Sequence, residues 1–178
     1  KLLKAPEHVG NVPTALGKEV YLMNIGVFGL FILAYYNLIG ASFNSVTFGL
    51  VFCMLCTAGS GSHPGNVWPI MLGYVVGSFG FAALSGLAGG SYAMTINAQA
   101  IAIGLCFANG LSPITSKYGW FWGMVSAVMH FLLVTSVPNM HGGFCLYNGG
   151  FTAAVICVLL VPVLEKCVKT RAEKTATK

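Results

Sequence analysis

Charged residues are scarce in this sequence of 178 residues, of which 7% are charged and 56% are hydrophobic. Soluble domains carry about 25% charged residues. Between residues 20 and 164, Lys117 is the only Lys, Arg, Asp or Glu. No soluble surface can be built from such a stretch, because an exposed apolar patch on the order of several hundred Å² already promotes association. The lack of charge excludes a soluble domain and predicts an integral membrane protein.

The few basic residues gather near the two ends of the chain, whose net charge is +5. Apart from Lys117 they are Lys1, Lys4, Lys18, Lys166, Lys169, Arg171, Lys174 and Lys178. Basic residues that flank membrane spans favour the cytoplasmic side. We therefore expect a multi-pass protein of a cell membrane, the bacterial inner membrane, with both termini cytoplasmic and no nucleic-acid partner.

A recognisable leader is also missing from the sequence. The first apolar run begins only at Val20 and has no small-residue cleavage site of the kind that ends a signal peptide. Because the chain begins with Lys1, we expect it to be part of a longer or processed protein.

Four of the six cysteines lack the polar surroundings of a redox or metal site, and only Cys145 lies in a polar loop. Cys53, Cys56 and Cys106 lie in apolar runs, as does Cys157, and there Cys acts as a small hydrophobe. In the loop at 138–150, His141 and Cys145 would supply only two ligands, too few for a metal centre. No metal and no cofactor is expected.

Six apolar segments predict an all-α fold, a polytopic transmembrane helix bundle. The segments at 20–40, 67–84 and 119–137 are long enough to span the hydrocarbon core. Those at 46–59, 96–107 and 151–164 are shorter, and short segments can be broken or re-entrant. Within 67–84, Gly73 and Gly77 form a GxxxG pattern that permits close helix packing. The predicted parts are a polar arm or linker at 1–19, a transmembrane domain at 20–167 and a basic cytoplasmic tail at 168–178 that frays.

The distribution of basic residues agrees with six crossings. Six passes would place both ends and Lys117 on one side of the membrane. Re-entrant folding of two short segments would change the number of passes by an even number, so this agreement leaves both topologies open.

A weak internal similarity links 51–74 with 101–127. The dipeptide Leu-Cys occurs at 55–56 and again at 105–106, an offset of 50, and Trp68 matches Trp122 at an offset of 54. Each stretch contains a short apolar segment, a small polar break and a span. Structural repeats with broken helices in corresponding positions are common in transporters.

The apolar segments are separated by breaks that combine glycine with neutral polar residues: GSGSHPGN (59–66), TINAQ (95–99), ANGLSP (108–113) and PNMHGGFCLYNGG (138–150). An interrupted helix exposes N–H and C=O groups, and glycine lets a solute approach the backbone. This chemistry predicts a channel or transporter for a small, largely uncharged polar solute, or for an ion that carbonyls coordinate. The predicted pathway residues are His63, Asn66, Asn97, Gln99, Asn109, His130, His141, Asn148 and Thr152.

The three histidines of the membrane region have two interpretations each. An ionisable residue inside a membrane is a functional candidate, but His63 and His141 can equally lie in hydrated loops. His130 either faces the bundle as a polar site or makes a helix-to-helix hydrogen bond. If the breaks at 59–66 and 138–150 both dip inward, they meet near the midplane; otherwise they are ordinary loops.

Two other functions stay open. Ser60 and Ser62 in GSGS loosely match the motif of an intramembrane serine-type hydrolase, which also needs a histidine within reach. A structural or assembly subunit without transport activity is the second alternative.

The stretches HPGNVWPIMLGY, INAQAIAIGLCFANGLSPI and NMHGGFCLYNGGFTAAVI resemble an uncharacterised bacterial family of polytopic membrane proteins, a domain of unknown function. The likeness covers nearly the whole chain and resembles that family's C-terminal half. More distantly, the short apolar segments and the YNGG turn are similar to urea-transporter-type channels, which have paired re-entrant helices in two inverted repeats. The Leu-Pro-x-x-Thr-x-Pro-Phe stretch of those channels is absent, so urea is not implied as substrate. The expected partners are the lipid bilayer, a small solute, a preceding homologous half and further copies in a homo-oligomer.

Overall fold

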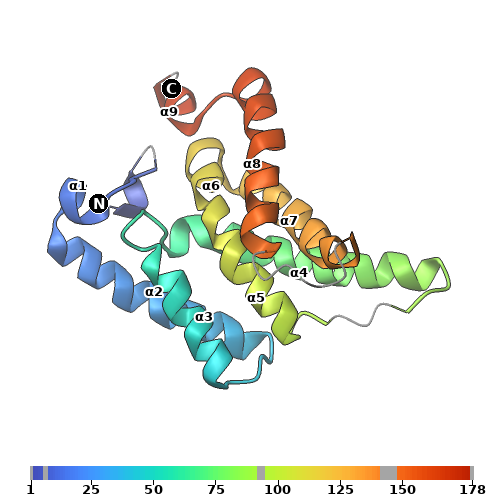
Figure 1. Cartoon of the computed structure of the whole chain (residues 1–178). Coiled ribbons are helices and arrows are strands. Elements are labelled where there is room, and N and C mark those ends of the chain that lie inside the picture. The colour runs from blue at the N-terminus through green and yellow to red at the C-terminus, as the bar shows by residue number, and fades with distance from the viewer. Residues whose placement is uncertain (1, 6–7, 92–94, 141–147, 177–178) are drawn as a thin grey trace.

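A computed structural model describes residues 2–5, 8–91, 95–140 and 148–176 of the chain (Figure 1). Every regular element in these ranges is a helix, which confirms the all-α prediction. The elements are η1 (Leu2–Lys4), α1 (Val12–Leu16), α2 (Lys18–Leu38), α3 (Ser45–Cys56), α4 (Pro64–Leu87), α5 (Gln99–Ala108), η2 (Asn109–Leu111), α6 (Ser112–Tyr118), α7 (Trp120–Met140), α8 (Asn148–Cys167) and α9 (Arg171–Ala176).

Each of the six predicted apolar segments contains a helix. Within the described residues, α2, α4, α7 and α8 are long and apolar enough to cross a membrane, which identifies a multi-pass membrane protein. The helix α3 has only 12 residues and α5 only 10. At 1.5 Å per residue these two helices are about 18 and 15 Å long, roughly half of the hydrocarbon thickness.

The helices alternate in direction along the chain. Residues 24 and 35 of α2 contact residues 62 and 71 respectively, so α2 and α4 run the same way. Gly73 and Gly77 of α4 contact Ala127 and Phe131 of α7 respectively, so α4 and α7 also run in the same direction. By the same criterion α8 runs parallel to α5 and α6, because Gly149 packs against Phe107 and Glu165 pairs with Lys117.

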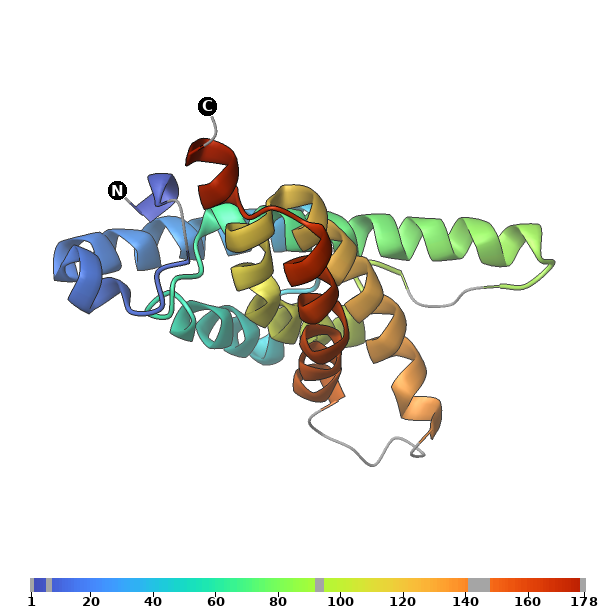
Figure 2. The ribbon, with the colours of Figure 1, turned by 90° about the horizontal axis from the view of Figure 1, so that it is seen from above.

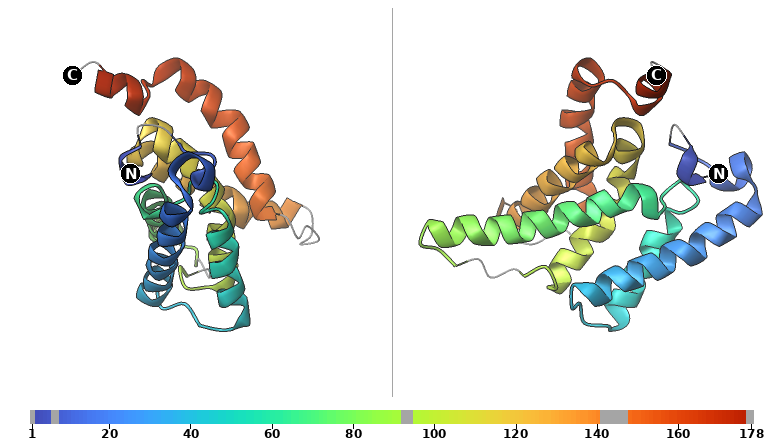
Figure 3. Two further views of the ribbon diagram at one scale, coloured as in Figure 1. Left: turned by 90° about the vertical axis from the view of Figure 1, so that its left-hand side faces the viewer. Right: turned by 180° about the vertical axis from the view of Figure 1, so that it is seen from behind.

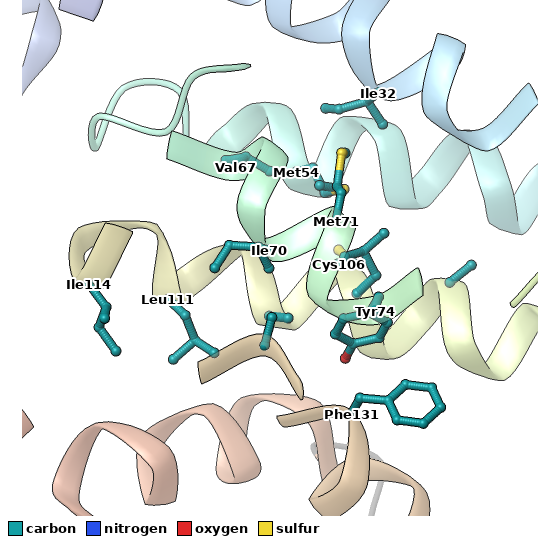
Figure 4. Packing of buried hydrophobic residues seen from close by; sticks show 14 of the residues in the cluster. Ile32, Met54, Val67, Ile70, Met71, Tyr74, Cys106, Leu111, Ile114 and Phe131 are labelled. Carbon is teal, nitrogen blue, oxygen red and sulfur yellow. The ribbon is translucent and has the colours of Figure 1, made fainter. Parts of the chain in front are cut away.

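The predicted GxxxG pattern lies in the contact between α4 and α7. A methyl group added at Gly73 would lie 2.6 Å from Cβ of Ala127, and one added at Gly77 would lie 2.9 Å from the ring of Phe131. Only glycine therefore permits this approach of the two helices. Phe131 continues the contact by meeting the ring of Tyr74 edge-on, with centroids 5.6 Å apart (Figure 4).

The buried core extends from this contact to both sides of α4. Figure 3 shows α8 on one side of α4 and the pair α2 and α3 on the other. The core combines side chains of α4 with those of α2, α3, α5, η2, α6, α7 and α8, and among those labelled in Figure 4 are Ile32, Met54, Ile70, Met71, Leu111 and Ile114. In contrast, the C-terminal half of α4 projects beyond the other helices (Figure 2), and its Phe79 and Leu84 are exposed.

Several boundaries differ from the prediction. The break predicted at 108–113 stays helical, because η2 and α6 follow α5 directly and only the type of helix changes. The break at 138–150 is narrower than expected, since α7 reaches Met140 and α8 begins at Asn148. The tail, expected to fray, contains α9, where Glu173 accepts a hydrogen bond from the backbone N–H of Thr170.

Candidate functional site

The first break ends at a tightly fixed helix start. His63 is the N-cap of α4: its Nδ1 accepts a hydrogen bond from the Gly65 N–H at 3.0 Å. In return, Oδ1 of Asn66 accepts from the His63 N–H at 2.9 Å. This reciprocal arrangement satisfies two backbone donors that a helix start leaves open. Gly61, with φ of 94°, supplies a left-handed turn just before the cap.

The breaks at 59–66 and 108–113 meet inside the protein. Ser62 Oγ lies 3.0 Å from Ser112 Oγ, and both residues are buried. Asn66 donates from Nδ2 to Ser116 Oγ at 3.0 Å and to the Gly61 carbonyl at 2.9 Å. Each of the two side-chain pairs joins residues 50 positions apart, the offset of the Leu-Cys repeat.

Asn109 extends this cluster toward the end of α3. Its Nδ2 donates to Thr57 Oγ1 and, at 3.4 Å, to the Met54 carbonyl. Its Oδ1 is buried and has no hydrogen-bond partner in the described part of the chain. A fully buried acceptor without a partner is uncommon in proteins. We call the residues Thr57, Ser62, His63, Asn66, Asn109, Ser112 and Ser116 the break cluster; none of them carries a formal charge when His63 is neutral.

The break cluster lies inside the bundle, at the level of Asn24 and not at the level where α2 begins. Asn24 of α2 donates from Nδ2 to the Ser62 carbonyl at 2.9 Å and to the Ala58 carbonyl at 3.4 Å. Asn24 is six residues from Lys18, where α2 begins, which corresponds to about 9 Å along the helix axis. The first break is therefore held at a depth set by α2, and its carbonyls are paired with a buried amide.

The N-terminal arm covers the break cluster from the side of α1. The Val12 N–H donates to the Gly59 carbonyl at 2.9 Å, and His8 Nδ1 lies 3.4 Å from Ser116 Oγ. Between arm and cluster is a cavity of about 80 Å³ lined by residues that include His63, Asn66 and Ser116. Burial, with smaller contributions from His8 and Arg171, lowers the pKa of His63 to about 4. His63 is therefore neutral at pH 7.

A second polar cluster joins α4, α7 and α8. Tyr74 Oη lies 2.7 Å from His130 Nδ1, and His130 Nε2 lies 2.9 Å from the Gly149 carbonyl. Thr152 Oγ1 lies 3.0 Å from the same Nε2. An imidazole protonated on Nε2 fits this geometry, because Nδ1 then accepts from the tyrosine hydroxyl. His130 thus makes hydrogen bonds between helices, and its place in a solute pathway stays a prediction.

The other predicted pathway residues lie apart from both clusters or at their edge. Asn148 donates to the Val134 carbonyl at 3.0 Å, and its Oδ1 has no partner among the described residues. Asn97 and Gln99 are exposed near the start of α5, and Gln99 contacts Asn44 at 3.5 Å. His141 and Cys145 lie outside the described residues, and so does most of the break at 138–150.

The described residues contain no group of three or more His, Cys, Asp or Glu side chains that could hold a metal ion. Within the described residues, no hydrogen bond joins a histidine ring to the hydroxyl of Ser60 or Ser62. His63 Nδ1 accepts from the Gly65 N–H instead, and the Ser62 hydroxyl lies against that of Ser112. The described cysteines are free thiols.

Sequence reasoning missed several members of the break cluster. Ser112 and Ser116 are common residues without a motif of their own, and Ser62 stood out only as part of the loose hydrolase motif GSGS. Their signal was the offset of 50 residues: carried forward from the Leu-Cys dipeptides, it pairs Ser62 with Ser112 and Asn66 with Ser116. Asn24 gave a different signal, because it is an amide inside the first turns of the predicted span at 20–40.

The helices and their apolar surfaces define a multi-pass helical membrane protein with two buried polar clusters. The chain belongs to the family described as Protein of unknown function (DUF1576), whose profile matches residues 12–166. This match confirms the predicted membership in an uncharacterised family. No curated protein and no solved structure matches the chain.

Proposed function

We propose that the protein is a channel or transporter for a small, largely uncharged polar solute, and that the break cluster forms part of its pathway. The observation that carries this proposal is the contact between the two breaks, with Ser62 and Ser112 at 3.0 Å. Irregular backbone at membrane depth is tolerated only where protein buries it or where it lines a cavity.

The chemistry of the cluster supports a neutral solute. It offers hydroxyls, amides and a neutral imidazole but no formal charge, and Asn109 Oδ1 is an acceptor without a partner among the described residues. A charged substrate would lose its hydration without a counter-charge, which is costly in a membrane interior. A solute with N–H or O–H groups can instead exchange water for these side chains.

The contacts support a transport unit built from two repeats that run in the same direction through the membrane. The helices α3 and α4 form one helix–break–helix unit, and α5, η2, α6 and α7 form a second. Side-chain hydrogen bonds between the two units join residues 50 to 56 positions apart, from Ser62–Ser112 to Tyr74–His130. Two units that run in parallel are related by an axis along the membrane normal. Inverted repeats, which the likeness to urea-transporter-type channels implies, would need a further homologous half.

The orientation follows from the basic residues. Lys18 begins α2, whereas Lys117 and Lys166 lie in the last turns of α6 and α8. Because the helices alternate in direction, all three lysines lie at the same end of the bundle. The positive-inside rule makes this end cytoplasmic. The break cluster then lies about 9 Å inside the cytoplasmic end of α2, and the N-terminal arm covers it from that side. We place the protein in the bacterial inner membrane, as a homo-oligomer.

A flux measurement tests the pathway. Ser112→Leu would fill the contact between the breaks, and we expect it to lower the permeability of proteoliposomes to glycerol, formamide or acetamide by at least about tenfold, since a blocked path raises the barrier by more than about 1.4 kcal/mol. Ser136→Leu, at an exposed position on α7, is the matched control and should transport like the wild type. Equal flux in all three proteins, each with the same unfolding temperature, would contradict the assignment.

A second variant covers the case in which Ser112→Leu fails to fold. In Ser62→Cys/Ser112→Cys the two sulfur atoms would replace hydroxyls that lie 3.0 Å apart, so a disulfide should form on oxidation. Oxidation should stop flux and a reductant should restore it, while the wild type, treated in the same way, should not respond. Flux that is unaffected by a disulfide verified by mass spectrometry would place the pathway elsewhere.

A further inference from the structure

A larger cavity lies beside the break cluster at the end of the bundle where the basic residues gather. It has a volume of about 580 Å³ and is lined by residues of α4, α6, α7 and α9. All three tryptophans of the chain, Trp68, Trp120 and Trp122, line it. Neither the proposed pathway nor the family description assigns a role to this cavity.

The aromatic side chains of the cavity mark a membrane–water interface. The rings of Trp68 and Trp120 stack with centroids 6.1 Å apart, and both side chains are substantially exposed. Phe121 stands edge-on to Trp120 and Trp122. Tryptophans gather at the level of the lipid headgroups because their rings are apolar and their N–H groups need a hydrogen-bond partner.

The charge of the cavity is positive. Arg171 and Lys174 line it from α9, three residues apart and hence on neighbouring positions of one helix face. Neither forms an ion pair within the described part of the chain, whereas Lys117 pairs with Glu165 at 3.0 Å. None of the described lining residues is acidic. Thr115 also lines the cavity, and its buried hydroxyl has no partner among the described residues.

We propose that this cavity binds the phosphate-bearing headgroup of an anionic membrane lipid. Arg171 and Lys174 provide donors for the phosphate oxygens, and the tryptophans hold the glycerol and upper acyl region. The position of the tryptophans, at the ends of the membrane-spanning helices α4 and α7, favours a lipid over a free anion in solution. Basic pockets between helices on the cytoplasmic side are suited to such headgroups.

Tryptophan fluorescence tests this site without any transport measurement, because all three tryptophans report on the same cavity. The protein is placed in nanodiscs of phosphatidylcholine with increasing amounts of brominated phosphatidylglycerol, and in parallel with brominated phosphatidylcholine. We expect stronger quenching by the anionic lipid at equal bromine content. A basic residue near an anionic surface is worth about fivefold in affinity, so Arg171→Ala/Lys174→Ala should weaken the anionic preference by about 25-fold.

The control removes the same charge from the same end of the chain. Lys166→Ala/Lys169→Ala changes two exposed basic residues that do not line the cavity, and it should keep the preference. Equal quenching by both lipids, or an equal loss in both double variants, would overturn the site. Inorganic phosphate at constant ionic strength should not displace the lipid; if it does so as readily as phosphatidylglycerol binds, the ligand is a soluble phosphate and the lipid assignment is wrong.

Discussion

The two helix–break–helix units differ most in the helix that follows each break. In the first unit the chain leaves the helix at residue 57, turns at Gly61 and starts the 24-residue helix α4 in one piece. In the second unit η2 leads directly into α6, which ends after 7 residues, and α7 begins only after a turn at Gly119 with φ of 103°. Pro64 and Pro113 each occupy one of the first two positions of the helix after the break.

The two units also differ in length after the break. The contact offset is 50 at the break cluster, in Ser62–Ser112, and 54 where Gly73 meets Ala127. The second unit thus holds four more residues, at the turn between α6 and α7, and α6 corresponds to the first turns of α4. Both units contribute a hydroxyl to the polar contact between the breaks. Only the first unit has a side-chain cap, at His63, because the chain before α4 is irregular, whereas η2 leads directly into α6.

The largest expected effect comes from breaking the reciprocal pair of His63 and Asn66 that caps α4 in the first unit. Asn66→Ala would leave the His63 N–H and the Gly61 carbonyl without partners, and we expect it to lower the free energy of unfolding by about 3 kcal/mol. Ser116→Ala, at the equivalent position of the second unit, should cost only about 1 kcal/mol. Thermal and denaturant unfolding in detergent measures both; similar losses would show that the two units rely on their breaks equally.

Close packing between the units should have the next largest effect. Gly73→Ala places a methyl group 2.6 Å from Ala127 and 2.7 Å from the Met124 carbonyl, so we expect a loss of about 2 kcal/mol from overpacking. Gly80→Ala is the control, since nothing lies within 4 Å of a methyl group there, and its higher helix propensity should leave stability unchanged or raised. A neutral Gly73→Ala would mean that α4 and α7 are not in close contact.

Acid should destabilise the protein in part through His63, which caps the first unit. The pKa of His63 is about 4 in the folded protein and 6.5 in an unfolded chain, so the unfolded state takes up a proton first as the pH falls. The free energy of unfolding should therefore decrease from pH 6.5 toward pH 4, by about 1 to 2 kcal/mol at pH 5. His63→Asn keeps an N-cap that does not titrate, and this variant should lose less stability over the same range. An identical pH profile in both proteins would remove His63 as the cause.

The smallest effect concerns the contact that the units share. We expect Ser62→Ala and Ser112→Ala each to cost about 1 kcal/mol, and the double variant to cost no more than either single one, because each hydroxyl is the other's partner. A double-mutant cycle on unfolding free energies measures this coupling. Strictly additive losses would show that the two hydroxyls do not bond each other.

The sequence predicted the helices better than their mutual arrangement. Apolar runs define where α2, α4 and α7 lie, and glycine spacing identified Gly73 and Gly77 as a packing surface, since these properties are local. Which breaks meet depends on contacts between residues 50 positions apart, and no local pattern around Ser62 or Ser112 encodes it. Near Asn109 the chain stays helical despite Gly110 and Pro113, because proline is tolerated in the first turn of α6.

The separation of 50 residues between the paired breaks has a consequence for biosynthesis. The amide of Asn66 and the hydroxyl of Ser62 reach the membrane before Ser116 and Ser112 have been made. At about 5 to 20 residues per second, the first break waits roughly 3 to 10 seconds for its partners. During that interval its polar groups need water, lipid headgroups or the insertion machinery, so the first unit matures only when the second arrives.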